Sequence, residues 1–437
     1  MSDSDIRASK PSSLRAAAQH ISDAVDGYES DLYTINSEIQ SKPELCFKEF
    51  HAHDVIVAFL EKCGLAVTKR AFGLETSFLA EYGEGGRVVT FCAEYDALPE
   101  IGHGCGHNLI AASSIAAFLG AVAAVKQSSA PGRVQLLGCP AEEGGGGKLK
   151  LIEAGAFANV DAALMIHPTP PVDHSTPDIA GISYGTCLAA CGMNAAFIGK
   201  PAHAAAMPWA GVNALDAATL SYTAIGLLRQ HIKPSDRINI IMPEGGTAHN
   251  VIPEKSLTRC NVRSENASQM YSLKERVENC FKGAATATGC TLNLTEVMAP
   301  YTDIRPNEAL CAEFSDSMQE QGRKFLCNLE KRELSSFSTD MGKEPLLATI
   351  TDIHTKSIIP GNVSYEVPSF HGNFCISTAL GVGLHTEEFR DAAKTYESHK
   401  RAMGVGKGMA AAGLRVLLDD EFASLVKRNF EADKKTR

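Results

Sequence analysis

Two histidines and a cysteine stand within a stretch of five residues, in the order His103, Gly104, Cys105, Gly106, His107. Two acids, Glu94 and Asp96, precede this stretch, and a long apolar run follows it. Thiolate, imidazole and carboxylate groups are together the ligands that a borderline-soft ion such as zinc takes in proteins. A redox cysteine is a weaker interpretation, because Cys105 has no Cys-x-x-Cys partner. The residue types favour a metal site, and a glycine-rich turn with unrelated polar residues is the alternative.

Further residues that can bind metal follow other apolar runs of the chain. Glu142 and Glu143 follow "VQLLGCPA", His167 follows "AALMI", and His385 lies in "GVGLHTEEF". Each has an ordinary explanation when it is taken alone, since acids suit a helix start and a single histidine after a strand is usually packed or exposed. If the runs are parallel strands, however, their carboxyl ends meet at one edge of a sheet, which is where such sheets bind ligands. The joint pattern therefore indicates a metal site.

The adjacent glutamates Glu142 and Glu143 also suit hydrolysis. One carboxylate can bind a metal while its neighbour accepts a proton from a water that the ion has made more acidic. The residue types and their spacing thus predict a metallohydrolase.

The elements that must position these residues follow from the apolar pattern. Strand-like runs alternate with helical ones through the first part of the chain, including an alanine-rich run over 109–125. This alternation predicts an α/β fold with a mostly parallel sheet covered by helices. From about residue 185 to residue 299 the order becomes strand, helix, strand, strand, helix, strand, which is that of a ferredoxin-like α+β unit. We predict a catalytic metal-binding domain from residues 1–185 and 300–437, with a smaller domain inserted at 186–299.

Composition excludes several classes of protein. A formal net charge of −10 argues against nucleic acid as a partner, because phosphate binding needs a basic surface. The alanine-rich run 109–125 is just short of a membrane span and is expected to be a buried helix, so no membrane partner is predicted. The polar N-terminus has no apolar signal core, and the 13 cysteines follow no disulfide pattern. These features predict a cytoplasmic protein with reduced thiols.

Several motifs occur together and in a fixed order: "EYDALPEIGHGCGHNLIAAS", "PAEEGGGGK", "MIHP", "KPAHAAAMP", "GTAHNVIPE" and "HTEEF". This order resembles peptidase family M20, the metallopeptidases that include aminoacylase, hippurate hydrolase and auxin-conjugate amidohydrolases. The first motif is most similar to the branch of Xaa-Arg dipeptidases and aminobenzoyl-glutamate hydrolase. The similarity runs from Pro43 to Leu414. It implies that the inserted domain is a lid and a dimerisation domain.

The resemblance also implies roles for individual residues. Cys105 matches the ligand that bridges two divalent metal ions, zinc in the first place, with manganese or cobalt as alternatives. Glu142 matches the general base, and Asp96 matches a residue that orients a ligand from behind. His103 matches a position that is not a ligand. The remaining metal ligands that the resemblance implies are His107, Glu143, His167 and His385.

Three residues of the inserted domain match substrate-binding positions of the family. His203 corresponds to a lid histidine that reaches the active site of the other subunit, so the resemblance implies a homodimer. Asn250 and Arg263 correspond to residues that hold the carboxylate or carbonyl of the substrate. From the residues alone, an asparagine before an Ile-Pro turn is usually structural, and an arginine on a strand is usually exposed.

The expected function is metal-dependent hydrolysis of an amide bond in a small N-acyl amino acid or a dipeptide. One alternative is a carbamoyl-amino-acid or allantoate-type amidohydrolase, against which the "CGHN" form of the cysteine motif argues. The other alternative is an inactive, metal-free scaffold relative. That alternative predicts lost ligands, whereas all five ligand positions are occupied by ligand residues.

One segment departs from the family pattern. In the family branch "STDMG" continues directly into "NVSYxVPSFH", whereas here residues 338–342 are followed by residues 343–360 before the motif resumes. The segment is interpreted either as an added surface loop or as translated intron sequence. A transcript that encodes the whole segment would exclude the intron. A real insertion at this place could disturb His385 or the mouth of the substrate site.

Overall fold

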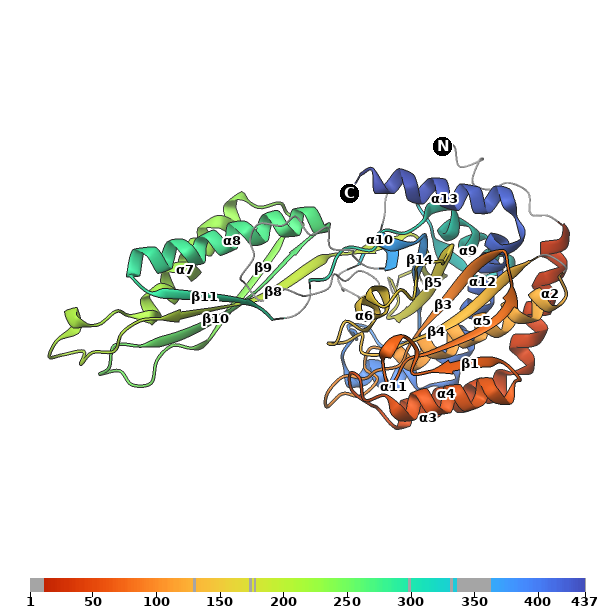
Figure 1. Cartoon of the computed structure of the whole chain (residues 1–437), viewed down its shortest axis with the longest axis horizontal. Coiled ribbons are helices and arrows are strands. Elements are labelled where there is room, and N and C mark those ends of the chain that lie inside the picture. Colours follow the sequence, from red (N-terminus) through yellow and green to blue (C-terminus); the bar gives the residue numbers. More distant parts are fainter. Residues whose placement is uncertain are drawn as a thin grey trace.

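The computed structural model describes residues 12–128, 131–172, 175–176, 178–297, 300–330, 333–335 and 363–436. The molecule has two lobes joined by extended segments (Figure 1). The larger lobe is built around an eight-stranded sheet and the smaller one around a four-stranded sheet. The interrupting segment 343–360 lies outside the described residues.

The large sheet is parallel at its centre, has antiparallel pairs on both sides of it, and ends at one edge in the parallel pair of β6 and β12. Adjacent strands β4, β3, β5 and β14 run parallel, whereas β2 pairs antiparallel with both β1 and β4, and β6 pairs antiparallel with β14. This arrangement confirms the predicted mostly parallel sheet. The strand order across the sheet is β1 (Ala66–Lys69), β2 (Phe78–Glu84), β4 (Gly132–Cys139), β3 (Arg87–Glu94), β5 (Ala162–Thr169), β14 (Ser369–Cys375), β6 (Ile179–Ile182) and β12 (Lys324–Leu326).

Helices cover both faces of this sheet. Alternate residues of β3 point to opposite faces: Val89 and Phe91 belong to one apolar cluster, and Val88 and Cys92 belong to another. The first cluster includes residues of α2 (Ser12–Gly27), α3 (Glu29–Ser41), α4 (Phe50–Lys62), α5 (His107–Lys126), α9 (Glu308–Glu320), α11 (Glu387–Ala393), α12 (Tyr396–Leu418) and α13 (Asp420–Lys434). The second includes residues of α6 (Gly147–Glu153) and α10 (Val363–Glu366).

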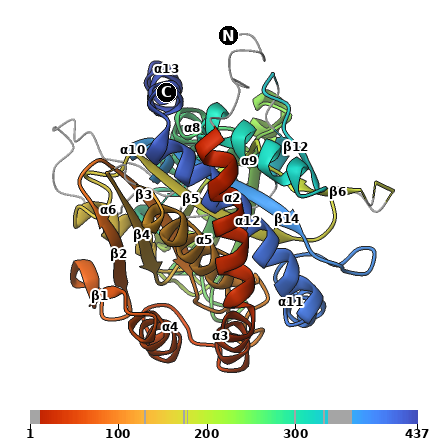
Figure 2. The same cartoon turned by 90° about the vertical axis from the view of Figure 1, so that its right-hand side faces the viewer.

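The central helix α5 packs against α2 and α12 and against strands β3 and β5 (Figure 2). A Cβ atom at Gly406 of α12 would lie 2.8 Å from the carbonyl oxygen of Ser113, so glycine is required for the close contact of the two helices. In length and apolar composition α5 would suffice to cross a bilayer, yet 94% of its apolar window is buried inside the protein. It is a core helix, as the sequence predicts.

The smaller lobe contains strands β8 (Ala189–Ile198), β9 (Arg237–Glu244), β10 (Lys255–Ser264) and β11 (Thr291–Glu296), with helices α7 (Ala214–Leu228) and α8 (Ala267–Thr288). All neighbouring strands are antiparallel, in the order β11, β8, β10, β9. This element order confirms the ferredoxin-like unit. Strand β7 (Gly185–Cys187), which precedes β8, pairs parallel with the short strand β13 (Glu333–Ser335). The domain boundaries at 186 and 299 stay a prediction.

His399 illustrates how the fold depends on pH. Its ring is buried between α12 and α3, where its Nδ1 atom lies 3.4 Å from Nδ2 of Asn36. Burial lowers the pKa of His399 to about 4. Because an unfolded histidine titrates near pH ~6.5, the unfolded chain gains a proton first as the pH falls, and the folded state loses stability between those two values.

We therefore expect His399→Gln to make the fold less sensitive to acid. The full loss from this one group is on the order of 3 kcal/mol, since one pKa unit corresponds to about 1.4 kcal/mol. Urea unfolding at pH ~7.5 and at pH ~4.5 measures the difference in the free energy of unfolding for both proteins. An equal drop in both would contradict this role for His399.

Candidate metal centre

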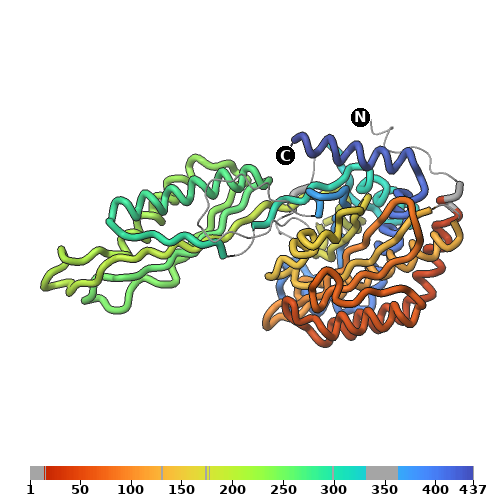
Figure 3. Tube along the Cα trace, viewed as in Figure 1, coloured from red at the N-terminus to blue at the C-terminus, as the bar shows by residue number. Residues whose placement is uncertain are grey.

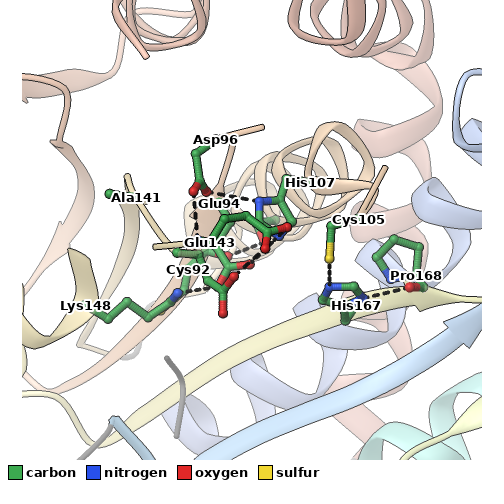
Figure 4. Close-up of polar contacts among 12 residues, drawn as sticks. Cys92, Glu94, Asp96, Cys105, His107, Ala141, Glu143, Lys148, His167 and Pro168 are labelled. Carbon is green, nitrogen blue, oxygen red and sulfur yellow. Dashed lines mark hydrogen bonds and ion pairs between the residues drawn. The ribbon is translucent and has the colours of Figure 1, made fainter. Parts of the chain in front are cut away.

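The carboxyl ends of three neighbouring parallel strands contribute residues to the predicted site. Glu94 is the last residue of β3, Glu142 follows the end of β4, and His167 lies near the end of β5. Cys105 precedes α5, and His107 is the first residue of that helix. The chain therefore delivers acids, histidines and a thiol to one edge of the sheet, as Figure 4 shows.

Six of these side chains form overlapping clusters of ligand atoms. Within the described parts of the chain, three groups have ligand atoms that all lie within 4.8 Å of one another. Cys105, His107 and Glu143 each belong to two of these groups, as a ligand shared by two ions would. His103 is in none of them. The groups are Cys105 with His107 and His167, Cys105 with Glu143 and His385, and His107 with Glu142 and Glu143.

Asp96 orients two members of the clusters. Its Oδ1 atom lies 3.0 Å from Nδ1 of His107, and its Oδ2 atom accepts a hydrogen bond of 2.9 Å from the backbone NH of Glu143. Burial alone would raise the pKa of Asp96, but the hydrogen bonds and the charge of His107 outweigh it and lower that pKa. An ionised Asp96 holds the proton of His107 on Nδ1, which leaves Nε2 facing the other ligands.

His167 is held in the same tautomer as His107, with the proton on Nδ1 and Nε2 available to a metal. Its Nδ1 atom donates to the carbonyl oxygen of Pro168 over 2.7 Å, and its Nε2 atom lies 3.3 Å from Sγ of Cys105. Burial and the nearby charge of His107 keep the pKa of His167 well below its ordinary value. The ring is therefore neutral, with a lone pair on Nε2 directed at the thiol.

Cys105 needs a cation before it can ionise. Burial and the negative charge of Glu143 raise the pKa of this thiol well above its ordinary value. A coordinating metal ion removes the proton of a bound thiol, so metal binding at Cys105 releases a proton.

His385 reaches the clusters from a distant segment of the chain. Its backbone NH donates to the carbonyl oxygen of Gly104 over 2.9 Å, and its Nε2 atom lies 3.7 Å from Oε1 of Glu143. Its φ angle of 62° is in the left-handed region, which is strained for a residue with a Cβ. Its side chain is 51% exposed, whereas the other cluster members are almost fully buried. The centre is thus open to solvent on the His385 side.

Two buried atoms test whether these residues fit a metal. Among the described residues, Nε2 of His107 and Oε1 of Glu143 are buried without a hydrogen-bond partner. They lie 3.8 Å apart, which is too long for a hydrogen bond. Two ligands of one tetrahedral zinc ion lie about 3.4 Å apart. The residues therefore fit a divalent metal held between them.

One feature of the centre was missed in the sequence. Glu94 and Lys148 are both fully buried and form an ion pair, and Oε2 of Glu94 lies 3.6 Å from Nε2 of His107. Lys148 is in the first turn of α6, the end of a helix that disfavours a cation. Because a lysine is unfavourable at this end of a helix, its presence after the four glycines indicates that an acidic partner lies nearby.

The three residues of the inserted domain lie outside the clusters. β8 leaves the junction between the lobes at Ala190, which pairs with Tyr301, and extends for ten residues, or about 30 Å. His203 follows the far end of this strand, and the NH of Ala204 donates to the carbonyl oxygen of Asn250 over 3.0 Å. Arg263 instead pairs with Ala190 beside the junction.

His203 and Asn250 are thus together and exposed at the far end of the smaller lobe. Figure 3 shows that this lobe points away from the larger one and that the two connecting segments run side by side. A single chain therefore does not bring His203 to its own cluster.

Comparison with known proteins identifies the family. Residues 90–362 match the model of peptidase family M20/M25/M40. The chain belongs to this family. The Xaa-Arg dipeptidase of Mus musculus is 36% identical over 95% of this chain and 92% of its own length. One of the subunits of the p-aminobenzoyl-glutamate hydrolase of Escherichia coli is 28% identical over 91% of this chain and 92% of its own.

The fold of the family is also found among solved structures. A dinuclear metal-binding peptidase of the M20 family from Bacillus subtilis superposes with a TM-score of 0.67 at 19% identity, covering 90% of this chain and 99% of that one. The comparisons confirm the predicted family, the α/β fold and the prediction of a metal-dependent amide hydrolase.

The buried pair of Glu94 and Lys148 gives a testable expectation. Lys148→Met leaves the Glu94 carboxylate buried without its cation, so the free energy of unfolding should fall by about 3–5 kcal/mol. Adding Glu94→Gln to this variant should recover part of the loss. Lys150→Met, on the exposed face of the same helix, is the control and should cost less than about 1 kcal/mol. Urea unfolding of the metal-free proteins measures all three, and equal losses for the two lysines would contradict the assignment.

Proposed function

We propose that the protein hydrolyses the peptide bond of dipeptides, with basic C-terminal residues as the first class to test and N-acyl amino acids as the second. The observation that carries the proposal is the convergence of one thiol, three histidines and two glutamates at one edge of the sheet. The similarity to the Xaa-Arg dipeptidase over nearly the whole chain supports this substrate class.

Two divalent ions would be held by Cys105, His107, Glu143, His167 and His385, with Cys105 shared between them. When bound, such ions make a water molecule more acidic and polarise the scissile carbonyl group. Zinc suits this mixture of thiolate, imidazole and carboxylate ligands, and manganese and cobalt are the other outcomes of a metal assay.

Glu142 is the general base of the proposal. Its carboxylate is 7% exposed, and Oε2 lies 3.9 Å from Nε2 of His107, so it faces the ligands from the end of β4. In this position it accepts a proton from the attacking water and delivers a proton to the leaving nitrogen. Glu143, its neighbour, is held in the ligand position by the hydrogen bond from its backbone to Asp96.

The smaller lobe supports the proposal of a homodimer in which it serves as lid. Strand β9 forms one edge of its sheet, and an exposed sheet edge favours pairing with another chain. Ile241 on this strand and Leu227 on α7 are exposed apolar residues, as is Trp209, whose side chain is 79% exposed near His203. A second copy would cover this surface and bring its His203 to the metal centre, while Asn250 and Arg263 bind the carboxylate or carbonyl of the substrate.

The location that we infer is the cytoplasm. All 13 cysteines are unbridged, which suits a reducing compartment.

A substrate panel with one matched pair of variants tests the proposed chemistry. Dipeptides with Arg, Lys or His at the C-terminus, N-acyl amino acids and N-carbamoyl amino acids are each assayed with zinc, manganese or cobalt added back. Glu142→Gln should lower kcat by a factor on the order of 10²–10⁴ and leave the metal content unchanged, because it removes proton transfer alone. Glu153→Gln, at an exposed position on α6, should keep full activity. Absence of bound metal together with absence of cleavage across the panel would exclude the proposal.

Mixing two inactive variants tests the homodimer. If His203 acts on the partner's centre, His203→Ala and Glu142→Gln chains co-expressed in equal amounts should regain about a quarter of the wild-type activity, since half of the dimers have one complete site of two. Light scattering checks the mass of the assembly. A monomer in solution, or no recovery in a mixed dimer, would show that His203 does not act between subunits.

A further inference from the structure

Glu49 is a fully buried acid that connects the N-terminal helices to the metal centre. It is the residue before α4 and is distant in sequence from every ligand. Its Oε1 atom accepts hydrogen bonds from the backbone NH groups of Phe47 over 2.8 Å and Ala141 over 2.9 Å. Its Oε2 atom accepts a hydrogen bond of 2.7 Å from the hydroxyl of Thr76.

Both backbone donors to Oε1 are in a strained conformation. Phe47 and Ala141 each have a φ angle of 59°, in the left-handed region that residues with a Cβ seldom adopt. Such a residue costs about 1–3 kcal/mol and persists only where its surroundings hold it. A single carboxylate oxygen thus holds two strained residues from different parts of the chain.

The strained Ala141 directly precedes the two glutamates of the centre. Its carbonyl oxygen accepts hydrogen bonds from the NH groups of Gly145 and Gly147 over 3.1 Å and 3.2 Å, which close the loop after the glutamates. A Cβ at Gly145 would lie 2.5 Å from the ring of Phe47, so the loop is packed directly on the residue that Glu49 also holds.

The pair Glu142–Glu143 is therefore held from both sides. At the second glutamate, the backbone NH of Glu143 donates to Asp96 over 2.9 Å. At the residue before the first glutamate, the backbone NH of Ala141 donates to Glu49. Rotation of the Ala141 backbone into the ordinary right-handed or extended region would redirect both carboxylates, because they follow it in the chain.

We propose that Glu49 is a positioning residue that holds the Ala141 turn and thereby aims Glu142 and Glu143 at the metal ions. The proposal rests on the proposed function, because the roles of the two glutamates do. It adds the segment before α4 to the parts of the chain on which the chemistry depends.

The protonation state of Glu49 suggests which substitution should preserve this role. Burial raises the pKa of Glu49 to about 7. A neutral side chain at this position still accepts both backbone NH groups through Oε1 and can donate to the Thr76 hydroxyl. Glutamine offers the same set of contacts, whereas leucine fills a similar volume without an acceptor.

The test compares Glu49→Leu with Glu49→Gln in the full-length protein. Glu49→Leu should lower kcat about 100-fold with KM changed less than about threefold, because a small misplacement of a catalytic group has an effect of this size. In the metal-free protein its Kd for zinc, measured by calorimetry, should rise about 10–100-fold. Glu49→Gln should restore both values to within about fivefold of the wild type.

Glu44→Leu is the matched structural control. Glu44 also holds the start of α4, by accepting hydrogen bonds from the NH groups of His51 and Ala52, but no hydrogen bond joins its carboxylate to the Ala141 turn in the described structure. This variant should lower the free energy of unfolding and leave kcat and the Kd for zinc unchanged. Equal effects of the two leucine variants on kcat and on Kd would overturn the proposal.

A second substitution tests the strain directly. Glycine adopts the left-handed region without a steric cost, so adding Ala141→Gly to Glu49→Leu should recover at least about fivefold in kcat and in zinc affinity. No recovery would overturn the proposal. If Glu49→Leu does not fold, Thr76→Val, which removes one contact of Glu49, replaces it. An unchanged kcat and Kd in Thr76→Val would then count against the proposal, and a decrease of severalfold would support it.

Zinc binding separates this proposal from the proposed function. Binding is measured without substrate, so failure to cleave dipeptides leaves the comparison of zinc affinities intact. A wild-type protein that binds zinc but cleaves nothing defeats the proposed function alone. A Glu49→Leu protein that binds zinc as tightly as the wild type defeats the positioning role alone.

Discussion

Asp96 makes the contacts on which the geometry of the metal centre depends. One of its oxygens fixes the ring of His107, and the other fixes the backbone of Glu143, so a single carboxylate aligns ligands from α5 and from the loop after β4. Neither alignment follows from its own element, since a helix start and a glycine-rich loop both allow many side-chain directions. Because Asp96 follows the end of the buried strand β3, the position of the sheet determines the positions of the ligands that Asp96 aligns.

The charges around Asp96 explain why the centre is a cation site. Glu94, Asp96 and Glu142 are all buried near His107, with Glu143 beside them, and Lys148 forms an ion pair with Glu94. Burying several like charges is costly unless cations or protons compensate them. Burial raises the pKa of Cys105, and the negative charges of Glu143 and Glu142 raise it further. Two divalent ions would supply that compensation and would allow the thiol to ionise.

The sequence predicts the parts of this arrangement that repeat along the chain and not those that depend on single distant contacts. Apolar runs predict strands, and ligand residues at their ends predict a common edge, which is why His107, Glu143 and His167 could be grouped before the structure was known. The roles of Lys148 and Glu49 could not be predicted, because their partners are set by tertiary packing. Lys148 faces the end of β3, and Glu49 holds a turn 92 residues further along the chain. The separation of His203 from the clusters of its own chain does not follow from the residues alone, because it depends on the direction in which the smaller lobe projects.

The length of β8 connects the fold of the smaller lobe to the chemistry of the larger one. Ala190 of β8 pairs with Arg263 of β10 beside the junction between the lobes, and His203 follows the other end of β8, about 30 Å farther out. If both residues bind the same substrate, they must come from different copies of the chain, because one lobe cannot present both ends of its sheet to one centre. The exposed apolar residues near the far end, Trp209 among them, provide a surface that a second copy could cover. Assembly and catalysis are then coupled by the geometry of a single strand.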